Sequence, residues 1–351
     1  MPGAAGLHLR VDEPAEGAQA RLAEQLGNRL GKRIGIGGLL SDLDRQARTV
    51  DVPDTPSAIG FTWDEEDNAD AAWWPQGLTT SYDAAAMPSA TTRPDRRVLI
   101  SGWYAKHRGR ADTAARISVV DLDADGIGPR YRHVLLVEPY RSRWFGAVRH
   151  RLVRVHAGGL VWCGDRLLVA DTRRGLRVFD LADTIQLSGR TRGLPAGTTH
   201  VLPQSGSWHA GSDEGTRALR WSFVSLDRTD PGTLSLIAGE YDKRGSGARV
   251  ARWSLDPASG LPERDPAEVV RTDINSMQGA ARVEGGWVVT ASNGPRRRGH
   301  LWTSTGGTFQ QHARALPPGP EDVSWDGDAG RLWTQTEYPG RRYVLSTPLP
   351  R

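Results

Sequence analysis

Internal repetition is the feature of this sequence that most restricts how the chain can fold. From Ser57 onwards, short β-rich runs alternate with glycine, aspartate and asparagine turns, a pattern typical of many short antiparallel strands. Five segments align with one another, and each contains three successive strand-like runs. The first runs are 74–81, 156–162, 221–227, 277–283 and 320–326. The second runs are 98–104, 167–172, 235–241, 287–293 and 332–338. The third runs are 115–122, 175–181, 248–255, 299–305 and 341–347.

A fourth, outer run follows the third in every segment except the last. These runs are 132–138, 199–204, 267–272 and 311–316. For the last segment we expect the run SAIGFTW at 57–63, from the other end of the repeats, to act as the fourth strand. Such a strand would close the segments into a ring.

A ring of four-stranded sheets explains this repetition physically. One such sheet cannot bury both of its faces, whereas each sheet in a ring is covered by its neighbours. A β-sandwich would explain short strands but not five matched segments. The sequence therefore predicts an all-β fold: a single β-propeller of five four-stranded blades over residues 58–351. Residues 1–57 are predicted to be a partly helical N-terminal extension packed on the propeller, with Leu22, Leu26 and Leu30 at helical spacing before a glycine-rich turn at 35–38.

In this organisation the chain resembles bacterial five-bladed β-propeller proteins, a largely uncharacterised group. The resemblance covers residues 74–350 and rests on the blade pattern alone. Trp-Asp does not recur in each segment as a WD signature would, and the sequence lacks the kelch double-glycine repeat with its paired aromatics. The resemblance therefore implies the fold and transfers no residue role.

Composition narrows the partners and the compartment. The formal charge is +4, but basic and acidic residues are interspersed, which argues against a nucleic-acid partner. Cys163 is the only cysteine, so no disulfide can form within the chain. No apolar run reaches the length of a signal peptide or a membrane-spanning helix. We therefore expect a cytoplasmic monomer that acts on a small molecule and not on a membrane, while a processed secreted form stays open.

The predicted ring also indicates where a ligand would bind. In a propeller the first strands line a central channel, and ligands bind at the mouth where first strands begin and second strands end. Turn chemistry explains aspartate, asparagine and glycine there, but not a histidine, glutamines, glutamates and tyrosines at matching places. The predicted substrate-binding residues are Trp74, Gln76, Trp103, Tyr104, Trp221, Tyr241, Gln278, Asn293, Glu321, Asp322 and Tyr338, and the predicted catalytic residues are His156, Asp171, Glu240 and Glu337.

Two of these predictions carry explicit alternatives. His156, ahead of Gly158 and Gly159, could be a general acid or base, a metal ligand, or a histidine bonded to the neighbouring blade. The dipeptide Glu-Tyr occurs at 240–241 and at 337–338. Its glutamates could form an acid/base pair, or the repeat could reflect ancestry, with the tyrosines packing and the acids capping amides.

Two acidic runs are candidate calcium sites because carboxylates are preferred ligands of that ion. The run DEEDNAD at 64–70 is interpreted as a solvated loop in preference to a cation site. The run 121–126 imitates an EF-hand loop, but its twelfth position is Arg132, so a hairpin turn is expected. No metal or other cofactor is therefore predicted, with calcium the less favoured alternative. Cys163 is predicted to be a buried structural thiol.

Two functions are compatible with these residues. The first is an enzyme that uses acid/base catalysis, without an organic cofactor, on a small molecule in the central pocket. Cyclase, lyase and isomerase reactions are preferred to hydrolysis, and a biosynthetic role to a scavenging one. The alternative is a lectin-like or scaffold propeller with equivalent ligand sites, one in each blade. Counting binding sites by calorimetry would separate the two.

Overall fold

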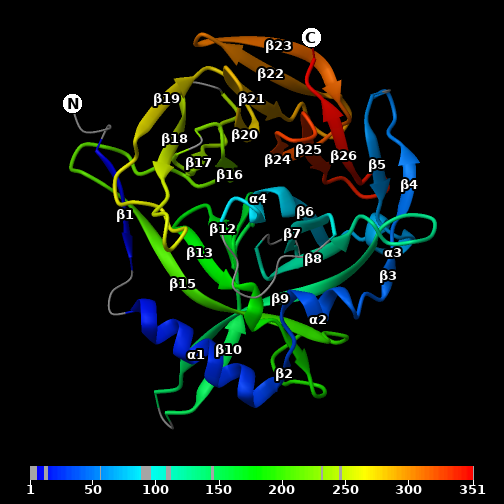
Figure 1. The fold of residues 1–351 in the computed structure, drawn as a ribbon, viewed down its shortest axis with the longest axis vertical. Coiled ribbons are helices and arrows are strands. Elements are labelled where there is room, and N and C mark those ends of the chain that lie inside the picture. Colours follow the sequence, from blue (N-terminus) through cyan, green and yellow to red (C-terminus); the bar gives the residue numbers. More distant parts are fainter. Residues whose placement is uncertain are drawn as a thin grey trace.

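The chain forms a ring of antiparallel β-sheets around a central axis, as the ribbon of the computed structural model shows (Figure 1). The structure describes residues 6–11, 15–55, 57–87, 96–107, 112–143, 146–230, 232–244 and 247–350. Its elements agree with the predicted all-β propeller with a partly helical N-terminal part. Within the described residues, no helix is long and apolar enough to cross a membrane.

The first two repeats share one sheet of 13 strands. One unit is β6 (Trp73–Thr80), β7 (Val98–Ala105), β8 (Ala115–Asp121) and β9 (Arg130–Arg141), and the next is β11 (Leu160–Cys163), β12 (Arg166–Asp171), β13 (Gly175–Asp180) and β15 (His200–Ser212). The outer strands β9 and β15 pair in parallel and join the two units, and β10 (Val148–Leu152) and β14 (Ile185–Leu187) extend the sheet. Because this pairing merges two units, the number of separate blades stays a prediction.

Three further sheets complete the ring. The first consists of β16 (Phe223–Asp227), β17 (Ser235–Gly239), β18 (Ala248–Ser254) and β19 (Glu268–Thr272). The second consists of β20 (Met277–Val283), β21 (Gly286–Ala291), β22 (Gly299–Thr305) and β23 (Thr308–Leu316). The third consists of β24 (Pro320–Asp326), β25 (Arg331–Thr336) and β26 (Tyr343–Pro348), followed by β5 (Ile59–Thr62) and β4 (Arg48–Asp51).

The closure of the last sheet agrees with the sequence-based expectation. Strand β5 pairs antiparallel with β26, from Tyr343 opposite Thr62 to Ser346 opposite Ile59. A strand from early in the sequence thus supplies the fourth strand of the last repeat.

The N-terminal residues pack along the outer strands of the 13-stranded sheet. Strand β1 (Leu7–Val11) pairs with β15, β2 (Gly31–Arg33) with β14, and β3 (Arg45–Gln46) with β9. Helix α1 (Ala15–Leu30) buries Leu26 and Leu30 against Ile185 and Val201. The boundary at residue 57 stays a prediction, and β4, which precedes it, pairs with β5.

One local prediction in this region is wrong. The glycine-rich stretch 35–38 is not a turn before a helix, because it forms the first part of helix α2 (Gly35–Leu40). The cause is tertiary packing, which overrides the low helix propensity of glycine. Ile36 and Leu39 are buried in the apolar core between the first two repeats.

The start of the second repeat explains a pair of glycines. Its first strand begins at Leu160, four residues later than predicted, and Ala157 has a positive φ of 53°. A Cβ on Gly158 would lie 2.0 Å from the Ser222 carbonyl oxygen, and one on Gly159 would lie 2.0 Å from the Val224 nitrogen. Only glycine permits this approach of two backbones. The segment 156–159 is thereby held against the next repeat and carries His156 to the central cavity.

Candidate functional site

A central cavity of about 830 Å³ opens where first strands begin and second strands end. Its walls come from β6, β7, β12, β20 and β24 and from the residues that follow β17 and β25. The predicted residues that line it are Trp74, Gln76, Tyr104, His156, Asp171, Tyr241, Gln278, Glu321, Glu337 and Tyr338. Lining residues that the sequence analysis did not select are Lys106, Asp112, Arg154, Val155, Thr172, Arg173, Arg220 and Ser222.

Two glutamates in this cavity are buried with little to balance their charge. Glu321, in β24, is 2% exposed and accepts a hydrogen bond from the side-chain amide of Gln278 at 3.1 Å. Glu337 follows β25, is half-buried, and accepts one from the side-chain amide of Gln76 at 3.0 Å. Among the described residues, no lysine, arginine or histidine nitrogen lies within ion-pair distance of either carboxylate.

This environment favours the protonated form of both groups. Burial, reinforced by the neighbouring carboxylates of Glu337 and Asp322, raises the pKa of Glu321 well above its usual range. Burial also raises the pKa of Glu337, although its bond with the Tyr338 hydroxyl and the nearby Lys106 act in the opposite direction. The two carboxyl groups therefore lie in one cavity with unequal tendencies to lose a proton.

A third carboxylate, Asp322, lies beneath the cavity and does not line it. It is fully buried, and its Oδ2 accepts backbone N–H bonds from Leu78 at 3.1 Å and Leu160 at 3.3 Å. Burial raises the pKa of Asp322 well above its usual range. Because Asp322 joins the first strands of three repeats, its position differs from the substrate-binding position predicted for it.

Aromatic side chains form much of the wall. The His156 ring stacks on Tyr104 with centroids 4.1 Å apart, and its Nδ1 lies 2.8 Å from an Asp112 carboxylate oxygen. The Trp74 and Tyr338 rings meet at right angles with centroids 6.1 Å apart, and the Lys106 ammonium lies 3.2 Å from the centre of the Trp74 ring. Burial lowers the pKa of Lys106. The cavity thus combines flat apolar faces with a few polar groups, as small-molecule sites do.

Three other predicted residues also lie away from the cavity. Trp103 packs on Trp63 at 4.9 Å and Trp221 on Trp253 at 4.8 Å, and all four side chains are buried in the core. Asn293 lies in the connection between β21 and β22, where its amide donates to the Arg298 carbonyl at 3.4 Å. The alignment of strand ends located the mouth but did not indicate which side chains turn into it.

Glu240, predicted to be catalytic, lies in a buried ion pair. Its side chain is 2% exposed and contacts the Arg249 guanidinium at 2.8 Å and that of Arg217 at 3.0 Å. Although burial opposes it, the bond from Arg249 leaves the pKa of Glu240 lowered. Asp171 does line the cavity and is 3.0 Å from Nε of Arg177. Neither catalytic role is tested by these contacts.

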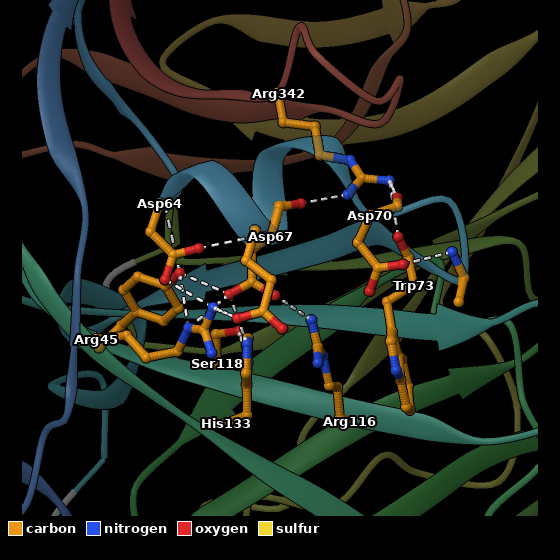
Figure 2. Close-up of polar contacts among 12 residues, drawn as sticks. Arg45, Asp64, Asp67, Asp70, Trp73, Arg116, Ser118, His133 and Arg342 are labelled. Carbon is orange, nitrogen blue, oxygen red and sulfur yellow. Dashed lines mark hydrogen bonds and ion pairs between the residues drawn. The ribbon is translucent and has the colours of Figure 1, made fainter. Parts of the chain in front are cut away.

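The acid-rich run 64–70 is not a simple solvated loop, because it contains the short helix α3 and places one acid, Asp67, in a buried cluster (Figure 2). Asp64 caps helix α3 (Glu65–Ala69) by accepting the Asp67 N–H at 2.8 Å. The Asp67 carboxylate is bonded by Arg116 at 2.8 Å, Tyr131 at 2.6 Å and His133 at 2.8 Å. Its Oδ2 is also 3.0 Å from Nε of Arg45. We call these residues the Asp67 cluster.

The other motifs behave as simple structural elements. The run 121–126 forms the turn between β8 and β9, and Arg96 contacts Asp121 at 2.7 Å. Cys163 is buried, and burial raises the pKa of its thiol to about 12. In the described part of the chain, no three His, Cys, Asp or Glu side chains are grouped so as to hold a metal ion.

Comparisons with known proteins give structural likeness only. No family model matches the sequence, and neither does any curated protein. The chain is similar in structure to an RS223 β-xylosidase (10% identity, TM-score 0.38), a GH43_1 enzyme from Xanthomonas citri (13%, 0.39) and the β-propeller domain of Cps50 (Swd1) from Myceliophteria thermophila (8%, 0.38). These matches cover 80, 81 and 87% of this chain and 93, 89 and 100% of the others. Likeness at this level does not identify the reaction of this chain.

Proposed function

We propose that this protein is an enzyme that acts on a small organic molecule by general acid/base catalysis in the central cavity. The observation that carries the proposal is the pair Glu321 and Glu337, two buried carboxyl groups in one cavity, each with a single side-chain amide donor and no ion-pair partner among the described residues. The cavity volume of about 830 Å³ suits a metabolite-sized ligand.

The two glutamates divide the roles by their surroundings. Glu321 is the more deeply buried, and of its charged neighbours only Lys106 favours ionisation, so Glu321 keeps its proton longer and acts as the general acid. Glu337 is assisted toward ionisation by Tyr338, Lys106, Gln76 and His156, so it acts as the general base. Such a pair delivers one proton and removes another in the same turnover. Elimination, isomerisation, ring closure and hydrolysis all have that requirement.

His156 offers a second route for protons. Its Nδ1 is bonded to Asp112, which holds the ring orientation, and the ring is about one-third exposed in the cavity. A histidine can accept a proton at one ring nitrogen and donate one from the other. We assign it the return of protons between Glu337 and solvent. Trp74, Tyr104, Tyr241 and Tyr338 would hold the substrate by their ring faces.

A propeller with one equivalent ligand site in each repeat fits the contacts less well. That function requires matched residues in matched environments. The two Glu-Tyr dipeptides differ: the carboxylate of Glu240 is bonded by arginines, whereas that of Glu337 faces the cavity. A single central site accounts for this difference.

The proposal is tested by untargeted turnover in heavy water. Wild-type protein, Glu321→Gln and Glu337→Gln are incubated with a metabolite extract in D₂O, and mass spectrometry records depleted, new and deuterated species. We expect wild type to convert or deuterate at least one metabolite and each variant to do so at least ~100-fold more slowly, because a positioned acid or base contributes about that much.

The exposed Glu284→Gln is the matched control and should retain the wild-type rate. A metabolite that binds the wild-type protein and is recovered unchanged, without deuterium, would overturn the enzymatic function in favour of simple binding. Equal rates in wild type and both glutamine variants would overturn the roles assigned to the glutamates.

A further inference from the structure

We infer that the substrate carries an oxyanion, a carboxylate or phosphate group, that is bound by Arg154 and Arg173 at one wall of the central cavity. That the bound molecule is a substrate rests on the proposed function. The anion-binding site is an additional feature, because acid/base chemistry alone does not require one. The physical basis is a group of arginines that have no partner among the described residues.

A second cavity of about 450 Å³ adjoins the central one. Arg154, Asp171 and Arg173 line both, so the two spaces share a wall. The remainder of the second cavity is formed by Glu138, Arg151, Leu152, Arg174 and Arg177. Five of its eight lining residues are therefore arginines, and two are acids.

The two acids of this cavity are already engaged. Arg177 lies 3.0 Å from Asp171 and 3.3 Å from Glu138, and Arg151 also contacts Glu138. These contacts neutralise both carboxylates. The positive charge of the remaining arginines is left uncompensated on this wall.

The guanidinium groups of Arg154, Arg173 and Arg174 make no hydrogen bond or ion pair with any residue that the structure describes. All three side chains are exposed. The buried arginines of the chain behave differently, since Arg116 and Arg249 are paired with Asp67 and Glu240. Like charges that converge without partners repel one another, and an anion between them would relieve that repulsion.

The backbone that carries Arg173 is fixed before any ligand arrives. It lies in the tight turn between β12 and β13, where the Arg173 N–H donates to the Asp171 carboxylate at 3.3 Å and the Arg174 N–H to the Asp171 carbonyl at 3.0 Å. Arg154 follows Val153, a fully buried core residue. A planar guanidinium on a fixed backbone is suited to bidentate recognition of carboxylate or phosphate.

The position of this wall gives the substrate an orientation. The cavity that contains Glu321 and Glu337 also contains Arg154, Arg173 and Arg220. An anionic group of the substrate, held by the arginines, would lie apart from Glu321 and Glu337. Its negative charge would then not lie beside their two carboxyl groups. The reacting part of the same molecule would then lie among the aromatic rings.

The test measures anion binding and needs no turnover. Inorganic phosphate and malonate are titrated separately by calorimetry at low ionic strength into wild type, the double variant Arg154→Gln/Arg173→Gln, and Arg297→Gln. Arg297 is an exposed arginine in the β21–β22 connection and is the charge-matched control. We expect affinity for at least one anion to fall about 10- to 100-fold in the double variant and to stay unchanged in Arg297→Gln, because a hydrogen bond to a charged group contributes that much.

The outcomes separate this inference from the proposed function. Tighter binding of malonate than of phosphate identifies a carboxylate substrate, and the reverse order identifies a phosphorylated one. Equal affinity in wild type and the double variant, or no binding of either anion to wild type, overturns the inference. Glu337→Gln should still bind the anion. If wild type binds the anion but converts no metabolite, the proposed enzymatic function is contradicted and the anion site is not. Circular dichroism of the double variant, whose changes are on exposed side chains, checks that it is folded.

Discussion

The ends of β17 and β25 carry the same dipeptide, Glu-Tyr, yet their glutamates have opposite environments. In the third repeat, Gly239 pairs with Val250, which places Glu240 beside Arg249, and a bidentate ion pair forms. In the last repeat, Gln335 pairs with Val344, and the same register places Glu337 beside Arg342. An arginine therefore faces the glutamate in both repeats. A missing arginine cannot be the reason why Glu337 forms no ion pair.

The difference lies in what else surrounds Arg342. Its guanidinium is fully buried and donates to the backbone carbonyls of Asp67, Asp70 and Trp73 (Figure 2). It also donates to the Glu337 carbonyl at 2.9 Å. The Nε and Nη2 donors, which Arg249 gives to its glutamate, thus go in Arg342 to the backbone carbonyls of Glu337, Asp70 and Trp73. Because these carbonyls bind Arg342, Glu337 forms no ion pair like that of Glu240, and its carboxylate faces the cavity.

The largest effect is expected where this arrangement is anchored, in the Asp67 cluster. Asp67→Asn removes a carboxylate that balances Arg116 and Arg45, and breaking a buried ion pair from one side costs about 3–5 kcal/mol. Urea denaturation measures the free energy of unfolding. Glu65→Gln, an exposed change on the same helix, should alter it by less than about 0.5 kcal/mol. If both variants unfold alike, the cluster does not anchor α3.

The comparison of the two dipeptides gives the next effect. Glu240→Gln leaves Arg249 buried without its counter-charge and should reduce the free energy of unfolding by about 3 kcal/mol. Glu337→Gln breaks no ion pair and should reduce it by less than about 1 kcal/mol. Paired denaturation curves measure the difference. A stability loss of equal size in both variants would mean that the two carboxylates are equally structural.

The smallest effect concerns Glu321 and has the opposite sign. Its pKa is raised in the folded protein, so the native state binds more protons than the unfolded state once the pH exceeds the ordinary glutamate value of 4.5. Stability then falls as the pH rises from that value toward the raised pKa. Glu321→Gln removes this loss and should stabilise the protein by about 0.5–2 kcal/mol near pH 8 and by almost nothing near pH 4.

Thermal and urea unfolding of wild type and Glu321→Gln at both pH values measure that effect. A variant that is destabilised more at pH 8 than at pH 4 would show that the ionised form of Glu321 is favoured in the fold. That result would remove the basis for treating it as the general acid.

The architecture was accessible from the sequence because strand periodicity and repetition are local signals. The runs at 98–104 and 299–305, for example, coincide closely with β7 and β22. No fourth run follows the third run of the last segment, and this gap is what predicts that 57–63 supplies the fourth strand. Once strand ends are aligned, the mouth of the ring follows, and most of the predicted residues line it.

The roles at the mouth were not accessible, because they depend on contacts between distant segments. Nothing local distinguishes Glu240 from Glu337, since the backbone carbonyls of Asp67, Asp70 and Trp73 that bind Arg342 lie about 270 residues away from Glu337. The run 64–70 looked solvated because its counter-charges come from residues such as Arg45 and Arg116 on other elements. Arg154 and Arg173 were missed because exposed arginines in turns have no distinctive pattern, and only the shared cavity wall sets them apart.

The pairing of β5 with β26 has a consequence for the order of events during synthesis. Residues 59–62 leave the ribosome long before residues 343–346, so the β4–β5 hairpin has an unpaired edge while the intervening repeats are made. Joining such distant segments carries a loop-closure cost in entropy that local strand pairs do not have. The ring is therefore expected to close last, and a nascent chain interrupted before residue 343 would expose two open sheet edges to its neighbours in the polysome.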